Sequence, residues 1–196
     1  MKKYRDHYFK KAKQENYPAR SVYKLQEMNN RFGLLKPGQK VLDLGAYPGS
    51  WSMFAAKQVG RKGLVLGVDQ QQPEQDLGPR IRFVVSDVLE PGPELIEVLQ
   101  QEAPLDLVLS DLAPQTTGIK IRDQARSLEL ARSAWEYARE YLRPGGHLAC
   151  KVFVGPDLPE LQKEMQGTFK KVKNLKPKSS RSESKETFIL GLEFKA

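Results

Sequence analysis

The chain has 196 residues, with 32 Lys and Arg against 24 Asp and Glu, so its formal net charge is +8. This length suits one domain, no apolar run is long enough to span a membrane, and the single cysteine excludes an internal disulfide framework. We therefore expect a cytoplasmic protein whose positive charge favours a polyanion, most commonly a nucleic acid. The N-terminus is basic but leads into no apolar core, so we expect no secretory signal.

Residues 1–33 are predicted to form a basic helical extension of a single domain that spans residues 1–196. Cations and aromatic rings are interleaved in its first part: Lys2, Lys3, Arg5, Lys10, Lys11, Lys13 and Arg20 with Tyr4, Tyr8, Phe9 and Tyr17. Cations for phosphates beside rings for base stacking are typical of surfaces that bind single-stranded RNA. A solvated helix is the alternative.

A second helix is predicted from residue 22 to Phe32, with Ser21 as its N-cap and Gly33 ending it. Its apolar residues recur at a spacing that places them on one helix face. Lys24 lies between two of them in the sequence, so we expect its side chain to point away from the centre of that face.

Residues 41–52 (VLDLGAYPGSWS) are an apolar run that ends in a glycine turn and continues into a helical pattern. The pattern predicts a buried parallel strand that passes into a helix through Gly45 and Gly49. Such turns bind ligands in open α/β sheets, because glycine permits a sharp turn and a close approach. Tyr47 occupies the place of the second glycine of dinucleotide sites, which disfavours a pyrophosphate. A nucleoside-type cofactor is favoured, and a turn without a ligand is the alternative.

Three further apolar runs, at residues 63–69, 81–87 and 105–111, each end in an acid. Together with Asp43 they predict four carboxylates at or near the carboxyl ends of strands, which form the ligand-binding edge of such a sheet: Asp43, Asp69, Asp87 and Asp111. Asp69 follows the glycine turn by about the 20 residues that place a carboxylate on a ribose hydroxyl. A cleft with this much negative charge favours a cation, such as a sulfonium, over a dinucleotide.

Predicted helices and strands continue to alternate in the second half of the chain. A helix is predicted over residues 121–142, then a strand over 147–154, a short helix over 158–165, and strands over 169–175 and 187–194. Lys151 lies among apolar residues of its strand, and lysine is seldom buried without a partner or a task; an edge lysine that reaches solvent is the alternative. Residues 176–185 are predicted to be a basic polar loop that either contacts RNA phosphates or is simply solvated. The order predicts a three-layer α/β fold with seven strands.

Five segments together resemble the FtsJ/RrmJ family of ribose 2′-O-methyltransferases: RSVYKL at 20–25, DLGAYPGSW at 43–51, SDLAP at 110–114, KVF at 151–153 and SRSESKE at 180–186. The resemblance runs from about residue 8 to the C-terminus. It implies a Rossmann-like class I fold that uses S-adenosylmethionine, with a seven-stranded, mostly parallel sheet and helices on both faces.

The resemblance also implies functional residues. A catalytic tetrad falls on Lys24, Asp111, Lys151 and Glu186, with Lys151 as the candidate general base. Cofactor contacts fall on Gly49, Trp51, Asp69, Asp87 and Asp111, to which the strand pattern adds Asp43 and Gly45. Tyr47 and Ser50 stand where the family commonly has Ala and Gly, so Tyr47 must point out of the cofactor turn or narrow it.

The substrate implied by the resemblance is a uridine of large-subunit (23S) ribosomal RNA, and we expect the protein to act on it as a monomer. Methylation of tRNA, an RNA-binding module without catalysis and an NAD-dependent oxidoreductase are the alternatives. We expect no metal, because His7 and His147 are far apart in the sequence and have no zinc-ligand spacing.

Overall fold

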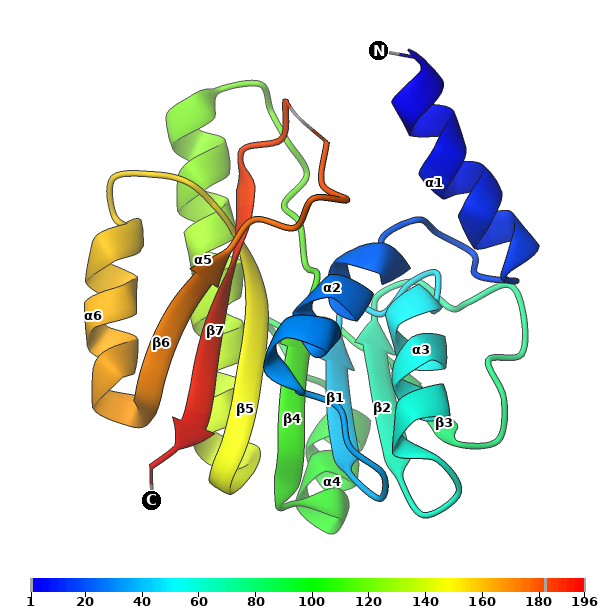
Figure 1. Cartoon of the computed structure of the whole chain (residues 1–196). Helices are drawn as coiled ribbons and strands as arrows, with labels where there is room; N and C mark the ends of the chain where they lie inside the picture. Colours follow the sequence, from blue (N-terminus) through cyan, green and yellow to red (C-terminus); the bar gives the residue numbers. More distant parts are fainter. Residues whose placement is uncertain (1, 182, 196) are drawn as a thin grey trace.

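A single seven-stranded sheet forms the centre of the computed structural model, which describes residues 2–181 and 183–195, with the backbone alone for residues 2–6. The strand order is β3-β2-β1-β4-β5-β7-β6 (Figure 1). The strands are β1 (Lys40–Leu44), β2 (Leu64–Asp69), β3 (Ile81–Val85), β4 (Leu105–Ser110), β5 (Leu142–Phe153), β6 (Phe169–Leu175) and β7 (Glu186–Phe194). Strands β1 to β5 pair in parallel, and β7 is antiparallel to both of its neighbours. The predicted seven-stranded, mostly parallel sheet is confirmed.

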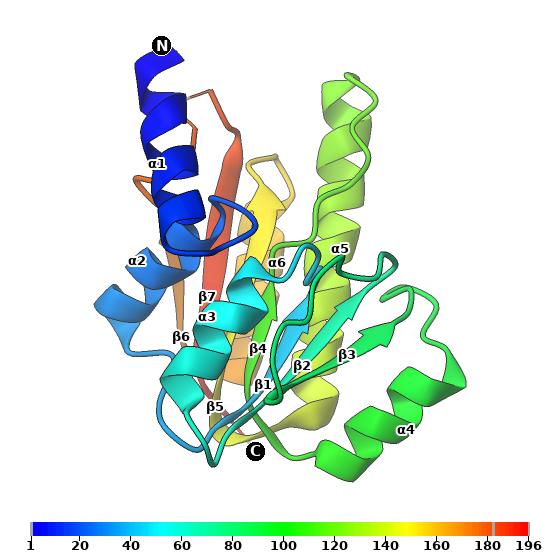
Figure 2. The same cartoon turned by 90° about the vertical axis from the view of Figure 1, so that its right-hand side faces the viewer.

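Helices cover both faces of the sheet (Figure 2). They are α1 (Lys2–Gln14), α2 (Val22–Phe32), α3 (Ser50–Val59), α4 (Pro93–Glu102), α5 (Lys120–Tyr141) and α6 (Leu158–Thr168). Successive strand residues point to opposite faces, so each face has its own core. Leu42 and Leu44 of β1 pack on the side of α4, α5 and α6, whereas Val41 packs with α2 and α3. Each helix of the described residues is too short or too polar to span a bilayer.

Two local features differ from the sequence prediction. The sequence pattern did not reveal α4, although its buried Leu95, Val98 and Leu99 have helical spacing and its first residue is a proline. Strand β5 begins at residue 142 instead of 147, because residues 142–146 continue along β4 past a register shift.

The ends of α2 show one confirmed and one wrong prediction. Gly33 adopts a left-handed conformation with φ of 61° and ends the helix as predicted. Ser21 is not a capping residue, because its backbone is already helical and its side chain makes no cap hydrogen bond. Helix α2 packs its apolar face, including Val22, Leu25 and Met28, against the sheet, so it is held firmly in place beside the carboxyl ends of the parallel strands.

Candidate active site

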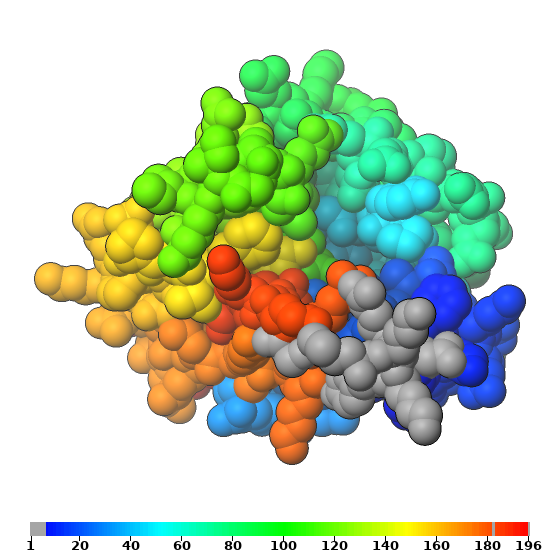
Figure 3. All heavy atoms as spheres, turned by 90° about the horizontal axis from the view of Figure 1, so that it is seen from above, coloured from blue at the N-terminus to red at the C-terminus, as the bar shows by residue number. Residues whose placement is uncertain are grey.

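The carboxyl ends of β1 to β4 surround a cavity of about 530 Å³, called the first cavity below. Figure 3 looks onto this edge of the sheet and shows a hollow between the segment before α5 (green) and the segments that follow β1 and β2 (cyan and turquoise). The charged residues in its wall are Asp69, Asp87, Asp111, Arg126 and Glu129. Four carboxylates against one guanidinium make this cavity acidic, which favours a cationic ligand.

The glycine turn after β1 forms part of the wall of the first cavity. Gly45 has φ of 77°, and a Cβ atom there would lie 2.9 Å from the side chain of Leu112, so only glycine lets the turn and the loop after β4 approach so closely. Asp69 accepts hydrogen bonds from the backbone N–H groups of Tyr47 (3.1 Å) and Gln71 (3.0 Å). Tyr47 therefore lines the cavity instead of pointing away from it.

Asp87, the second acid of the wall, is held by the loop that follows β2 and by its own loop. Asp87 accepts hydrogen bonds from the side chain of Gln70 (2.7 Å) and from the backbone N–H of Leu89 (2.8 Å). These contacts fix the carboxylate at the rim while leaving it in the wall of the first cavity. Gly45, Asp69, Asp87 and Asp111 thus come together as the sequence predicts.

Asp43, by contrast, lies outside the lining of the first cavity. It is fully buried, and its Oδ2 accepts a hydrogen bond from Ser52 Oγ at 2.6 Å. Burial raises the pKa of Asp43 to about 7, and the hydrogen bond from Ser52 opposes only part of that rise. Asp43 shares a sheet face with Val41, two residues earlier, and this face is covered by α3, which carries Ser52. We therefore correct the expectation that it reaches the rim.

Gly49 and Trp51 also lie outside this lining. Gly49 precedes α3 with φ of 110°, where a Cβ atom would collide with the side chain of Leu77. The indole N–H of Trp51 donates to the carbonyl oxygen of Ser21 at 2.9 Å, and its ring packs on Phe188 at 5.8 Å. In this structure Trp51 therefore joins α3 to the start of α2 and to β7.

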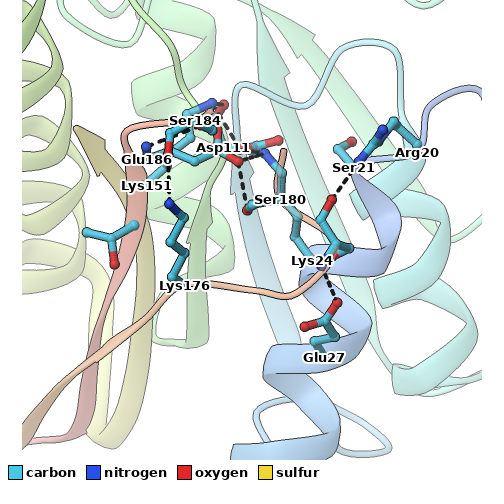
Figure 4. Close-up of polar contacts among 12 residues, drawn as sticks. Arg20, Ser21, Lys24, Glu27, Asp111, Lys151, Lys176, Ser180, Ser184 and Glu186 are labelled. Carbon is cyan, nitrogen blue, oxygen red and sulfur yellow. Dashed lines mark hydrogen bonds and ion pairs between the residues drawn. The ribbon is translucent and has the colours of Figure 1, made fainter. Parts of the chain in front are cut away.

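The four predicted tetrad residues meet at one point, although they come from four different elements (Figure 4). Lys24 Nζ lies 2.7 Å from Glu186 Oε1 and 3.7 Å from Asp111 Oδ1. Lys151 Nζ lies 3.0 Å from Asp111 Oδ1 and also donates to the carbonyl oxygen of Asp111. Lys151 is only 6% exposed, so the alternative of an edge lysine in solvent is wrong.

Sheet register explains this convergence. Ser110 of β4 is paired with Cys150 of β5, so Asp111, which follows the end of β4, and Lys151, which is still within β5, lie at the same level. Phe153 of β5 is paired with Glu186 of β7. Side chains two residues apart share a face, and Ala149 packs in the core on the α2 side, so Lys151 points to the side where α2 brings Lys24.

The charge state of Glu186 follows from its partners. Burial alone would raise its pKa, but the positive charge of Lys24 and hydrogen bonds from Lys24 and from Ser180 Oγ (2.9 Å) outweigh burial and lower the pKa. Glu186 is thus held as a carboxylate. Ser180 was not among the predicted site residues, and no local pattern in a polar loop identifies which hydroxyl will reach a distant acid.

A second cavity, of about 400 Å³, lies on the other side of the tetrad. Its lining comes from the start of α2 and from the loop before β7: Arg20, Ser21, Lys24, Ser179, Arg181, Glu183, Ser184 and Glu186. Asp111 lines the first cavity, whereas Lys24 and Glu186 line the second. The tetrad therefore lies between an acidic cavity and one that carries both signs of charge.

Two of the four rings predicted to stack on RNA make contacts within the protein. Tyr8 packs against Tyr23 at 5.2 Å, and Tyr17 is buried with Lys57 4.2 Å above its ring. Phe9 is 59% exposed and remains available. The side chains of Lys2, Lys3, Tyr4 and Arg5, and all of Ser182, lie outside the described residues. In the part of the chain that is described, no group of three or more His, Cys, Asp or Glu could hold a metal ion.

Comparison with known proteins agrees with this geometry. A family model described as FtsJ-like methyltransferase matches residues 17–194. Ribosomal RNA large subunit methyltransferase E of Oleidesulfovibrio alaskensis is 54% identical, covering 100% of this chain and 94% of the relative, and that of Nitratidesulfovibrio vulgaris is 52% identical, covering 100% and 96%. A crystal structure from Plasmodium falciparum, provisionally named a ribosomal RNA methyltransferase, is 29% identical with a TM-score of 0.77, covering 91% of this chain and 98% of its own.

Proposed function

The chain belongs to the FtsJ-like methyltransferase family, and from this premise we propose that it methylates a ribose 2′-hydroxyl in large-subunit (23S) ribosomal RNA. Its methyl donor is S-adenosylmethionine, the cofactor of this family. The observation that carries the proposal is the position of Lys24, Asp111, Lys151 and Glu186 between two cavities. The full-length similarity to relatives named ribosomal RNA large subunit methyltransferase E supports the substrate.

The first cavity fits the cofactor. S-adenosylmethionine supplies a methyl group on a positively charged sulfur, which leaves as a neutral thioether once the methyl is transferred. The four carboxylates in the wall of the first cavity attract this positive charge. Asp69, at the end of β2, lies where carboxylates of nucleotide-binding α/β folds bind ribose hydroxyls. We propose that Gly45, Asp69, Asp87 and Asp111 hold the cofactor.

The second cavity suits a nucleotide. Its volume of about 400 Å³ is within the usual range for small-ligand sites, which is about 300 to 1,000 Å³. Arg20 and Arg181 supply positive charge for the phosphates on either side of the target. A ribose in this cavity would face Lys24 and Glu186, which we propose orient its 2′-hydroxyl.

Lys151 is the proposed general base. A ribose hydroxyl is a weak nucleophile until its proton is removed, and Lys151 in its neutral form accepts that proton. Asp111, 3.0 Å from Lys151 Nζ, holds the ammonium that results. General-base catalysis contributes about 10²- to 10⁴-fold, or about 3 to 5 kcal/mol, whereas alignment of the reactants contributes about 7 to 11 kcal/mol. Placement of the hydroxyl should therefore matter more than proton removal.

We further propose that the protein acts as a cytoplasmic monomer. All four tetrad residues come from one chain, so a second copy need not complete the site. Cys150 is a fully buried free thiol, which suits a reducing compartment.

The proposal is tested by incubating the protein with tritiated S-adenosylmethionine and large ribosomal subunits from a strain that lacks the protein, followed by mapping of ribose methylation. We expect one 2′-O-methylated nucleotide in the 23S RNA. Methylation of tRNA alone, or of a base, would overturn the proposed substrate. A melting temperature raised by NADH and not by S-adenosylmethionine would support the oxidoreductase alternative.

A further inference from the structure

The loop between β6 and β7, residues 176–185, is bound to α2 along its backbone. The carboxylate of Glu27 accepts hydrogen bonds from the backbone N–H groups of Lys178 (2.7 Å) and Ser179 (2.8 Å). The guanidinium of Arg20 donates to the carbonyl oxygen of Ser179 at 2.6 Å. These three contacts join residues more than 150 positions apart in the sequence. The alternative of a loop that is simply solvated is therefore wrong, whereas contact of its side chains with RNA phosphates stays a prediction.

Beside these contacts, Ser179 and Ser180 are buried, whereas Lys178 is exposed. Ser179 is 2% exposed and Ser180 is 6% exposed. Lys176 Nζ donates to the carbonyl oxygen of Ser184 at 2.8 Å, which closes the loop on itself (Figure 4). Residues 178 and 179 are therefore bound to α2 through their backbone, and residues 179 and 180 are buried.

The hydroxyl of Ser180 joins the fixed loop to the carboxylate of Glu186, while the Ser184 hydroxyl accepts from the Glu186 backbone N–H at 3.2 Å. Ser180 Oγ donates to Glu186 Oε1 at 2.9 Å, and the same oxygen lies 2.7 Å from Lys24 Nζ. Lys24 and Glu27 are three residues apart on α2 and so share a helix face. One face of α2 thus contributes a lysine to the tetrad and also binds the loop that orients the partner of that lysine.

We propose that Glu27 is a positioning residue for methyl transfer: by binding two backbone amides of the 176–185 loop, it places Ser180 and hence Glu186. It also fixes Ser179, a wall residue of the second cavity. This inference rests on the proposed function. Glu27 does not contact the substrate, and Glu27 affects the transfer rate through the position of Glu186.

The test variant is Glu27→Gln, which keeps the size of the side chain but replaces one acceptor oxygen with a donor that faces a backbone N–H. We expect faster hydrogen exchange at the amides of Lys178 and Ser179, a single-turnover rate about tenfold lower, and an affinity for S-adenosylmethionine within twofold of the original. Glu27→Asp, which keeps the charge, should recover part of the rate. Ser180→Ala removes the hydrogen bond from the loop to Glu186 and should lower the single-turnover rate several-fold.

Glu164→Gln is the matched control. Glu164 also accepts two hydrogen bonds between elements, from the guanidinium of Arg132 at 2.6 and 2.7 Å, but it joins α5 to α6 away from both cavities. This variant should leave the transfer rate and the hydrogen exchange of the two loop amides unchanged. It therefore controls for the general loss of stability when a carboxylate that accepts two hydrogen bonds is replaced.

A double-mutant cycle with Glu186→Gln decides between a positioning role and a purely structural one. If Glu27 acts through Glu186, Glu27→Gln lowers the rate about tenfold in the original protein and less than twofold in the Glu186→Gln background. An equal loss in both backgrounds, or faster amide exchange with an unchanged rate, would overturn the inference. Full activity of Glu186→Gln by itself would instead contradict the proposed tetrad, and Glu27 would then have no catalytic group to position.

Discussion

The two cavities are built in different ways. Three of the four acids of the first cavity end a parallel strand or lie within two residues of its end, and Glu129 comes from α5. Hydrogen bonds between neighbouring loops, such as Tyr47 to Asp69, hold the strand-end acids. The second cavity is assembled from α2 and the loop before β7, which are joined by contacts such as Arg20 to Ser179. The first is thus a property of the strand ends, whereas the second exists only after distant parts of the chain have packed.

This difference separates two tasks. Residues of the first cavity should determine the affinity for the cofactor, and residues on the side of the second cavity should determine the transfer to RNA. The tetrad joins the two, because Asp111 lines one cavity while Lys24 and Glu186 line the other. Substitutions around the first cavity should therefore change the affinity for the cofactor, and substitutions around the second cavity should change the rate of methyl transfer.

The largest effect is expected from Lys151→Ala. Loss of the general base should lower the single-turnover transfer rate by about 10²- to 10⁴-fold, while the affinity for S-adenosylmethionine stays within a few-fold, because Lys151 does not line the first cavity. Calorimetry and a rapid-quench transfer assay measure the two quantities. Lys170→Ala, which removes an exposed lysine paired with Glu193, serves as the control. A Lys151→Ala enzyme with near-normal turnover would remove this residue from its role.

Asp111→Ala should change both the cofactor affinity and the transfer rate, because Asp111 lines the first cavity and also belongs to the tetrad. It removes one acid of the first cavity and the partner of Lys151, so we expect a transfer rate lower by about 100-fold together with a several-fold weaker affinity for the cofactor. The same two assays apply. Unchanged binding and unchanged rate would place Asp111 outside the site.

Asp43 provides a test of the buried layer beneath the first cavity. Burial raises its pKa from 3.8 to about 7 in the folded protein, so between about pH 4 and pH 7 the unfolded state loses a proton that the folded state retains. The free energy of unfolding should therefore fall with rising pH in this window, by up to about 1.4 kcal/mol per pH unit from this group. Asp43→Asn should lack that slope.

Urea unfolding of both proteins at pH 5, 6, 7 and 8 measures this contribution. The difference in free energy of unfolding between Asp43→Asn and the original protein should grow up to about pH 7 and then level off. Two curves that run parallel from pH 5 to pH 8 would show that Asp43 titrates in the folded protein as it does in the unfolded one.

The smallest effect concerns RNA affinity at α1. Replacing Lys10, Lys11 and Lys13 together with glutamine should flatten the dependence of log affinity on log salt concentration by about 0.7 for each phosphate that these lysines neutralise. Lys11 lies 3.8 Å from Glu15 and 4.8 Å from the Tyr23 ring, so these contacts should reduce its own share. The choice of methylated nucleotide should not change. An unchanged salt slope would exclude these lysines from the RNA interface.

The sequence predicts the first cavity better than the second, for a physical reason. An acid that is the last residue of a strand or follows it, as Asp69, Asp87 and Asp111 do, reaches the rim. Asp43 lies one residue earlier and is buried. The tetrad positions came from the family resemblance, because no local pattern pairs Lys24 with Glu186. Nothing in the sequence distinguishes Glu27 from other acids on a helix surface, because its partners, residues 178 and 179, are distant in the sequence.

The most direct test of the account is a crystal structure of the protein with S-adenosylhomocysteine and a short RNA that contains the target nucleotide. The account predicts the cofactor product in the first cavity beside Asp69 and Asp87, and the target ribose in the second cavity with its 2′-hydroxyl next to Lys151. A ribose bound elsewhere, with the tetrad turned away from it, would contradict the claim that the two cavities meet at the reacting atoms.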